Sequence, residues 1–121
     1  MPRDNRRAER VAAAIREEIA SYLTSGSRDS RISGMVTVTG VDVTSDLRRA
    51  RVYVSVMDSD GTDPVAVLNQ VGHRLRGEIG RALRLRLAPE LDFQIDETAA
   101  KASRIESLLA QIKAEDSNRE R

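Results

Sequence analysis

The stretch at residues 35–56, MVTVTGVDVTSDLRRARVYVSV, decides the fold. Residues 35–43 are rich in Val and Thr and poor in helix formers, which predicts a strand. Residues 50–56 alternate strictly, with Ala or Val at even positions and Arg, Tyr or Ser at odd ones, as in a strand with one buried face. The polar TSDLRR between them predicts a turn, so the two strands form an antiparallel hairpin. Gly40 indicates a bulge or a close backbone approach in the first strand.

Helical patterns flank this hairpin on both sides. Before it, apolar side chains recur at every fourth position and predict a helix over about residues 6–23; they are Val11, Ile15, Ile19 and Leu23. Asp4 or Asn5 is suited to cap the start of this helix.

After the hairpin, Asp63 supplies an N-cap and Pro64 suits the first position of a second helix. Its apolar stripe consists of Leu68, Gly72, Leu75, Ile79 and Leu83. The glycines at 72, 77 and 80 each weaken a helix by about 1 kcal/mol relative to alanine. We therefore expect two helical pieces with a kink near Val71–His73.

The remaining elements complete an α+β fold. Residues 90–96, ELDFQID, predict a third strand, and residues 105–112 predict a short amphipathic helix before a charged tail that we expect to be disordered. The order helix, strand, strand, helix, kink, helix, strand predicts a three-stranded sheet with helices packed on one face, and a right-handed crossover into the third strand. We assign residues 1–100 to a single domain and residues 101–121 to the C-terminal helix and tail.

The composition limits the classes of protein to consider. The 121 residues suffice for one domain, whose core must be aliphatic because the sequence has one Phe, two Tyr and no Trp. The absence of cysteine excludes disulfides and thiolate metal sites and is typical of a reducing compartment. No apolar run approaches the roughly 20 residues of a membrane helix, and no signal-peptide core follows the basic N-terminus. We expect a soluble, cytoplasmic protein.

The positive charge is concentrated in residues 71–86. The whole chain has a net charge of +1, but this segment holds five arginines and one glutamate, so the rest of the chain carries an excess of three negative charges. A patch of this kind attracts polyanions even when the total charge is near zero.

A helical wheel places arginines and glycines together, opposite the apolar stripe: Arg74, Gly77, Gly80, Arg81 and Arg84 share this exposed face. Close approach of a ligand backbone would explain glycines there, and arginine can donate two parallel hydrogen bonds to a phosphate. The alternative is that the glycines have no function and the arginines only keep the helix soluble. Arg86 falls on the apolar side of the wheel, so the helix should end by about residue 85.

Three blocks of the sequence resemble the bacterial ribosome-binding factor A family. They are RAERVAAAIREEIASYL, VTVTGVDVTSDLRRARVYVSV and IGRALRLRLAPELDFQID, in the order and spacing of that family. The resemblance covers about residues 6–112. It implies a type II KH-like fold and a non-enzymatic factor that binds the immature small (30S) ribosomal subunit and its 16S ribosomal RNA. It also implies a role in late maturation of that RNA, often linked to growth in the cold.

The resemblance places RNA binding on the basic helix. In the family a helical kink, commonly Ala-x-Gly, replaces the Gly-x-x-Gly loop of KH domains, whereas here Val71, Gly72 and His73 put the glycine one position early. We therefore leave these three residues out of the site. The residues assigned to RNA binding are Arg74, Arg76, Gly77, Gly80, Arg81, Arg84 and Arg86, with Arg48, Arg49 and Arg51 of the hairpin as lesser candidates. A further basic cluster, Arg3, Arg6, Arg7 and Arg10, either attracts RNA non-specifically or is only solvated.

Catalytic and metal chemistry have no support in the sequence. His73, the single histidine, has no second ligand at helical spacing, so it either faces solvent or contacts an RNA phosphate. Asp92 and Asp96 share a strand face but lie about 13 Å apart along an extended chain, beyond the roughly 5–10 Å of a two-carboxylate mechanism. Phosphate-loop and nucleophile-elbow motifs are also absent. We expect neither an enzyme nor a metal, cofactor or small-molecule substrate.

The scarcity of aromatic residues predicts binding through phosphates and shape, with little reading of bases. The rival interpretation to a monomeric RNA-binding factor is a protein-interaction module that dimerises through its sheet or its C-terminal helix. In that case the arginines only solubilise the protein. The helix at residues 105–112 either docks on its own domain or becomes ordered only on the ribosome.

Overall fold

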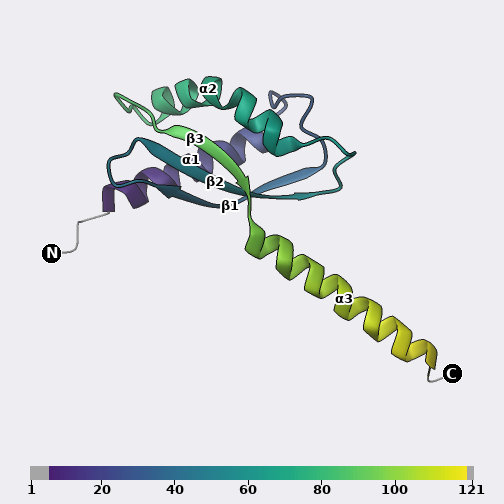
Figure 1. Cartoon of the computed structure of the whole chain (residues 1–121). Coiled ribbons are helices and arrows are strands. Elements are labelled where there is room, and N and C mark those ends of the chain that lie inside the picture. Colours follow the sequence, from purple (N-terminus) through teal and green to yellow (C-terminus); the bar gives the residue numbers. More distant parts are fainter. Residues whose placement is uncertain (1–5, 120–121) are drawn as a thin grey trace.

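The computed structural model describes residues 6–119, except for the side chains at positions 99, 100, 103 and 116–119. Its elements are α1 (Arg6–Thr24), β1 (Met35–Val43), β2 (Arg49–Met57), α2 (Pro64–Ala82), β3 (Glu90–Ile95) and α3 (Glu97–Arg119). Arg3 and the predicted caps Asp4 and Asn5 lie outside the described residues. α1 and α2 pack against the sheet, whereas α3 extends away from this body (Figure 1).

The sheet has the strand order β1-β2-β3. β1 pairs antiparallel with β2 and β3 pairs parallel with β2, which confirms the hairpin and the crossover. The pairing register shifts between Val38 and Gly40, which confirms the bulge. At the bulge, the hydroxyl of Thr39 donates a 2.7 Å hydrogen bond to the carboxylate of Asp96, across the sheet. The same carboxylate accepts from the backbone N–H of Thr98 (3.0 Å) and so caps the start of α3.

The core lies between one face of the sheet and the helices α1 and α2. Strand residues facing the helices are buried, whereas their neighbours on the other face, such as Arg51 and Thr37, are exposed. The buried side chains come from every element of the body, and they include Ile15, Ile19, Val52, Val54, Leu68, Leu75, Ile79 and Phe93. A three-stranded sheet with α1 and α2 on one face is thus confirmed, with Phe93 as the one aromatic residue among the fully buried ones.

α2 begins as predicted and then departs from the prediction. The carboxylate of Asp63 accepts a hydrogen bond from the backbone N–H of Ala66 (3.2 Å), with Pro64 at the start of the helix. The expected division into two helical pieces near Val71–His73 is wrong, because α2 runs unbroken from Pro64 to Ala82. Gly72 is buried, and a Cβ at this position would lie 3.7 Å from the ring of Phe93. That distance is ordinary van der Waals contact, so alanine would also fit here and the helix tolerates the intrinsic cost of this glycine.

One side chain ties α2 to β3. The amide of Asn69 accepts a hydrogen bond from the backbone N–H of Phe93 (2.9 Å) and donates one to its backbone C=O (3.1 Å). These bonds reach the edge of β3 that faces away from β2. They fix the position of α2 along the strand.

α3 is longer than predicted and does not dock on the domain. It takes in residues 114–119, which we expected in a disordered tail. Its apolar side chains stay 53–57% exposed and are Ile105, Leu108, Leu109 and Ile112. The expectation that this helix packs on its own domain is therefore wrong.

Candidate nucleic-acid interface

The end of α2 shapes the basic surface. Ala82 is the last helical residue and Leu83 the cap, which confirms an end before residue 85. The backbone N–H of Arg84 donates to the C=O of Arg81 (3.3 Å), and that of Leu85 to the C=O of Gly80 (2.9 Å). This is the bond pattern of a Schellman motif, whose first residue beyond the cap is left-handed. Arg84 occupies that position with φ +54°.

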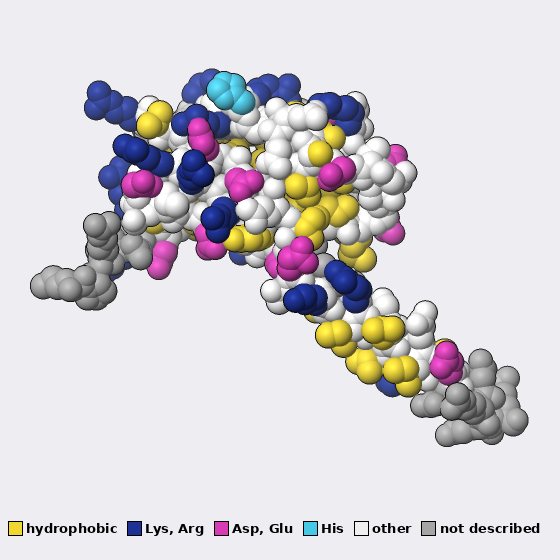
Figure 2. Space-filling model, in the orientation of Figure 1, with side chains coloured by type: hydrophobic (Ala, Val, Ile, Leu, Met, Phe, Trp, Pro, Cys, Tyr) yellow, Lys and Arg dark blue, Asp and Glu magenta, His cyan; other side chains and the backbone are white. Residues whose placement is uncertain are grey.

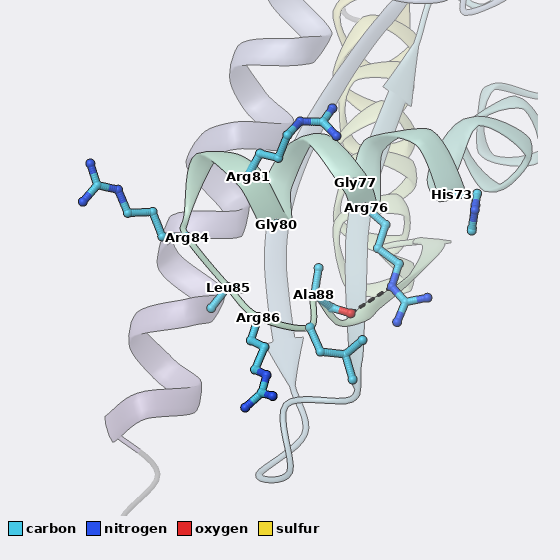
Figure 3. Close-up of a pocket in the computed structure, with 10 residues that line it drawn as sticks. His73, Arg76, Gly77, Gly80, Arg81, Arg84, Leu85, Arg86 and Ala88 are labelled. Atoms are coloured by element: carbon cyan, nitrogen blue, oxygen red, sulfur yellow. Dashed lines mark hydrogen bonds between the residues drawn. The ribbon is translucent and has the colours of Figure 1, made fainter.

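Arg84 therefore does not lie on the helix face where the wheel placed it. The wheel assumes that the helix continues, whereas a left-handed residue reverses the direction of the chain. Arg84 instead begins the segment 84–88, which folds back beneath the last two turns of α2 (Figure 3).

Two contacts hold the segment 84–88 against the helix. The Nε–H of Arg76 donates a 2.8 Å hydrogen bond to the backbone C=O of Ala88 (Figure 3). A Cβ at Gly80 would lie only 3.3 Å from the Cβ of Ala88, so the absence of a side chain lets the segment approach. We expected a ligand to come close at Gly80, but the chain's own segment fills that space. Arg76, assigned to RNA binding, has a structural role in addition.

Between α2 and the segment 84–88 lies an open hollow of about 620 Å³, here called the arginine hollow. Its residues are His73, Arg76, Gly77, Gly80, Arg81, Arg84, Leu85, Arg86, Leu87 and Ala88. The lining is of two kinds, with guanidinium-bearing residues beside the apolar Leu85, Leu87 and Ala88. Leu87 is 69% exposed. Gly77 remains exposed, and a Cβ there would meet only the Arg81 guanidinium, at 3.7 Å.

The exposed arginines of the hollow point in different directions. Arg81 lies over the helix, whereas Arg84 and Arg86 extend outward from the folded-back segment, away from each other (Figure 3). Arginine side chains gather over this end of the body in the space-filling view (Figure 2). The cations thus spread over an area, which suits several phosphates along a chain better than one isolated anion.

Arg74 does not line the arginine hollow. It lies close enough to Asp29 for its charge to act on that carboxylate. The pKa of Asp29 is lowered to about 2, mainly by hydrogen bonds from the side chain and backbone of Arg31, with smaller contributions from the charges of Arg31 and Arg74. Arg74 and Arg81 both lie on the regular helix, but only Arg81 lines the arginine hollow.

The hairpin arginines line two hollows, both of which contain acidic residues. Arg49 and Arg51 line a separate hollow that also contains acidic residues of β1 and β3: Asp42, Glu90 and Asp92. The pairing register puts Arg51 between Asp42 and Asp92, so carboxylates flank its charge on both sides. Such a compensated surface attracts a polyanion weakly. Arg48 and Arg49 line a further hollow with Arg76 and Leu87, which adjoins the arginine hollow but also contains the carboxylates of Asp46 and Glu90.

The apolar part of the hollow was not predicted from the sequence. Leu85 and Leu87 alternate with arginines, but whether they are buried or exposed depends on where the helix ends and which way the chain turns. No signal in the sequence gives that turn, because glycine is the usual residue at the left-handed position and here it is arginine.

Within the described part of the chain, no three His, Cys, Asp or Glu side chains gather into a potential metal site. No described helix is long and apolar enough to span a membrane.

The fold and the arginine hollow define a small α+β domain with one cation-rimmed surface. A sequence model of the family described as ribosome-binding factor A matches residues 7–109. The chain belongs to the ribosome-binding factor A family, which confirms the resemblance of its three sequence blocks.

Relatives agree with this assignment, and solved structures share the fold. Ribosome-binding factor A of Gemmatimonas aurantiaca is 54% identical over 112 residues, covering 91% of this chain and 77% of the relative. The protein of the same name from Desulforamulus reducens is 41% identical over 112 residues, covering 91% and 92%. The crystal structure of the Thermus thermophilus factor superposes with a TM-score of 0.62 at 23% identity, covering 73% of this chain and 94% of that one. A model of the Thermus factor fitted into a cryo-EM map of its complex with 30S gives a TM-score of 0.55 at 22% identity, covering 76% and 93%.

Proposed function

We propose that this protein binds the immature small ribosomal subunit through its 16S ribosomal RNA and promotes late maturation of that RNA. It acts as a cytoplasmic, monomeric KH-like factor without catalysis or cofactor, with a role in growth in the cold. Membership of the ribosome-binding factor A family supports this proposal, as does the fitted 30S complex of the Thermus relative. The observation that carries it is the arginine hollow, which gathers exposed cations on a chain of nearly zero net charge.

In this proposal Arg81, Arg84 and Arg86 contact RNA phosphates. All three are exposed, and no hydrogen bond or ion pair to another described residue occupies their guanidinium groups. Arg76 holds the segment 84–88 in place, and Arg48 extends the basic surface toward the hairpin. The logarithm of the binding constant falls linearly with the logarithm of the salt concentration. Each phosphate that a cation neutralises makes this slope steeper by about 0.9 on a duplex and by about 0.7 on a single strand.

The test is co-sedimentation of the full chain with purified small ribosomal subunits over a series of salt concentrations. The variant to compare is Arg81→Ala, Arg84→Ala and Arg86→Ala combined. If these side chains hold phosphates, the variant binds more weakly and its salt slope falls by about 2–3 units relative to wild type.

A second triple variant controls for total charge. Arg7, Arg10 and Arg16 on α1 are exposed, and their replacement by Ala changes the net charge by the same amount. An equal loss in both triple variants shows that only overall charge matters and refutes the arginine hollow as the grip. Wild-type protein that fails to bind even at low salt refutes the proposed function.

A second candidate function is supported by α3. Its exposed apolar side chains gather on the projecting helix (Figure 2) and suit a protein partner or a second copy of the chain. Replacing Leu108 and Leu109 by Ser tests this candidate, with sedimentation velocity over a range of protein concentrations as the measurement. Dimers in wild type that the variant abolishes would favour the interaction module, whereas a monomer at every concentration supports the monomeric factor.

A further inference from the structure

We infer that the arginine hollow takes one unpaired nucleobase, so that it distinguishes RNA with an accessible base from a bare or fully paired sugar–phosphate chain. This inference rests on the proposed function and deepens it. It also changes the expectation from the sequence, where the scarcity of aromatic residues predicted little contact with bases.

The first support is the lining of the hollow. Phosphate contacts need only cations and backbone N–H groups, yet this hollow also contains Leu85, Leu87 and Ala88. Leu87 exposes 69% of its surface to water in the middle of a basic region, where no packing partner covers it. An apolar surface beside guanidinium groups suits a nucleobase, which offers a flat face to apolar or guanidinium contacts and polar edges to donors.

The second support is the size and rigidity of the hollow. Its volume of about 620 Å³ lies within the roughly 300–1,000 Å³ of small-molecule sites, and one base with its sugar fits this range. The hydrogen bonds from Leu85 to Gly80 and from Arg76 to Ala88 hold its walls in place. A preformed site avoids the entropic cost of ordering a loop when the base enters.

The third support is Gly77. It stands exposed in the wall of the hollow, and only the Arg81 guanidinium would touch a Cβ there, at 3.7 Å. Alanine would therefore fit the free protein and would favour the helix. Only the flexible end of the Arg81 side chain reaches the space above Gly77, and a base entering the hollow would use that space.

The directions of the arginines agree with this arrangement. Arg81 and Arg84 extend to different sides of the hollow (Figure 3). A base inserted between them would leave its flanking phosphates on either side, within reach of separate guanidinium groups.

The experiment measures binding of the full chain to two single-stranded RNA probes of about ten nucleotides, labelled for fluorescence anisotropy. One probe is oligouridine, and the other is a fully abasic ribose–phosphate chain of the same length and charge. We expect wild type to bind oligouridine about five- to tenfold more tightly, the low end of the effect of one base stack. An oligouridine–oligoadenine duplex of the same length serves as the fully paired probe. Because its bases are not accessible, its affinity per phosphate should be no higher than that of the abasic chain.

Three variants locate the effect. Leu87→Ala and Gly77→Ala should each reduce the ratio of affinities for the two single-stranded probes toward one, although Gly77→Ala should melt at a higher temperature than wild type. Met35→Ala is the control, because Met35 is 62% exposed but lies on β1, outside the residues that line the hollow. It should keep the wild-type ratio.

The possible outcomes separate the inference from the proposed function. If wild type binds both probes equally, or if Leu87→Ala keeps the ratio, no base enters the hollow and the inference is wrong while RNA binding stands. If Met35→Ala lowers the ratio as much as Leu87→Ala, the base lies elsewhere and the inference is also wrong. If wild type binds neither the RNA probes nor small ribosomal subunits, both the inference and the proposed function are wrong.

Discussion

Replacement of Arg84 separates its effect on stability from its effect on binding. The residue follows the cap of α2 with φ +54°, a conformation that favours glycine. For any other residue the left-handed conformation costs about 1–2 kcal/mol. Glycine removes this strain, but its greater freedom in the unfolded chain returns about 0.5–1 kcal/mol.

The comparison to make is between Arg84→Gly and Arg84→Ala. Both variants lose the guanidinium and its interaction with the end of the helix, so these losses cancel in the difference. The difference in free energy of unfolding should then be about 0.5–1 kcal/mol in favour of glycine, which corresponds to about 2–4 °C in melting temperature.

Urea denaturation gives the stability of both variants, and co-sedimentation with small ribosomal subunits gives their binding. Each variant removes one cation, so both should lower the salt slope of binding by about 0.7–0.9, to the same extent. Arginine at this position would then lower the stability of the fold in exchange for a cation at the edge of the hollow. An alanine variant as stable as the glycine variant would show that residue 84 is not left-handed in solution, and the turn would need another explanation.

Three further changes test other parts of the structure. Phe93→Ala should lower the free energy of unfolding by about 3–5 kcal/mol in urea, because it empties a site in the core that is 2% exposed. Arg76→Ala should cost about 1.5 kcal/mol by the same assay, since it removes a charged donor to Ala88, and Arg76→Lys should not restore that loss. For Asp29, the pKa in the folded protein is about 2, below its ordinary value of 3.8. The ionised Asp29 therefore contributes fully to stability above pH 3.8, and this contribution is lost as the pH falls toward 2. Asp29→Asn should be less stable than wild type at neutral pH and as stable as wild type near pH 2. Denaturation midpoints over a pH series measure this difference.

Much of the fold could be predicted from local patterns. Alternation at residues 50–56 and the helical stripe around Ile15 and Ile19 follow directly from which faces are buried, and Gly40 marked the bulge. The continuity of α2 through Gly72 could not be predicted in the same way. Propensity counts the cost of each glycine in the helix, but the burial of Leu68, Leu75 and Ile79 in the core outweighs it.

The site was predicted less completely than the fold. Arg81 and Gly77 do lie together as a wheel predicts, because they are on regular helix. Arg84 and Leu87 follow the end of the helix, where the position of each side chain depends on one left-handed residue and on the bond from Arg76 to Ala88. The sequence also does not show which arginines have carboxylates beside them in space. Asp42 and Asp92 lie beside Arg51 because of the strand pairing, and a charge pattern along the chain cannot give that pairing.

The contact between Asn69 and Phe93 has a consequence for aggregation and strand exchange. β3 ends the sheet, and an unpaired edge strand is a template on which another chain can add a strand. The Asn69 amide offers one acceptor and one donor to Phe93, as the peptide group of a neighbouring strand would. The middle of this edge is thus already paired within the molecule. An incoming strand would first have to displace α2, so an unfolded or second chain that extends the sheet is directed to β1 instead.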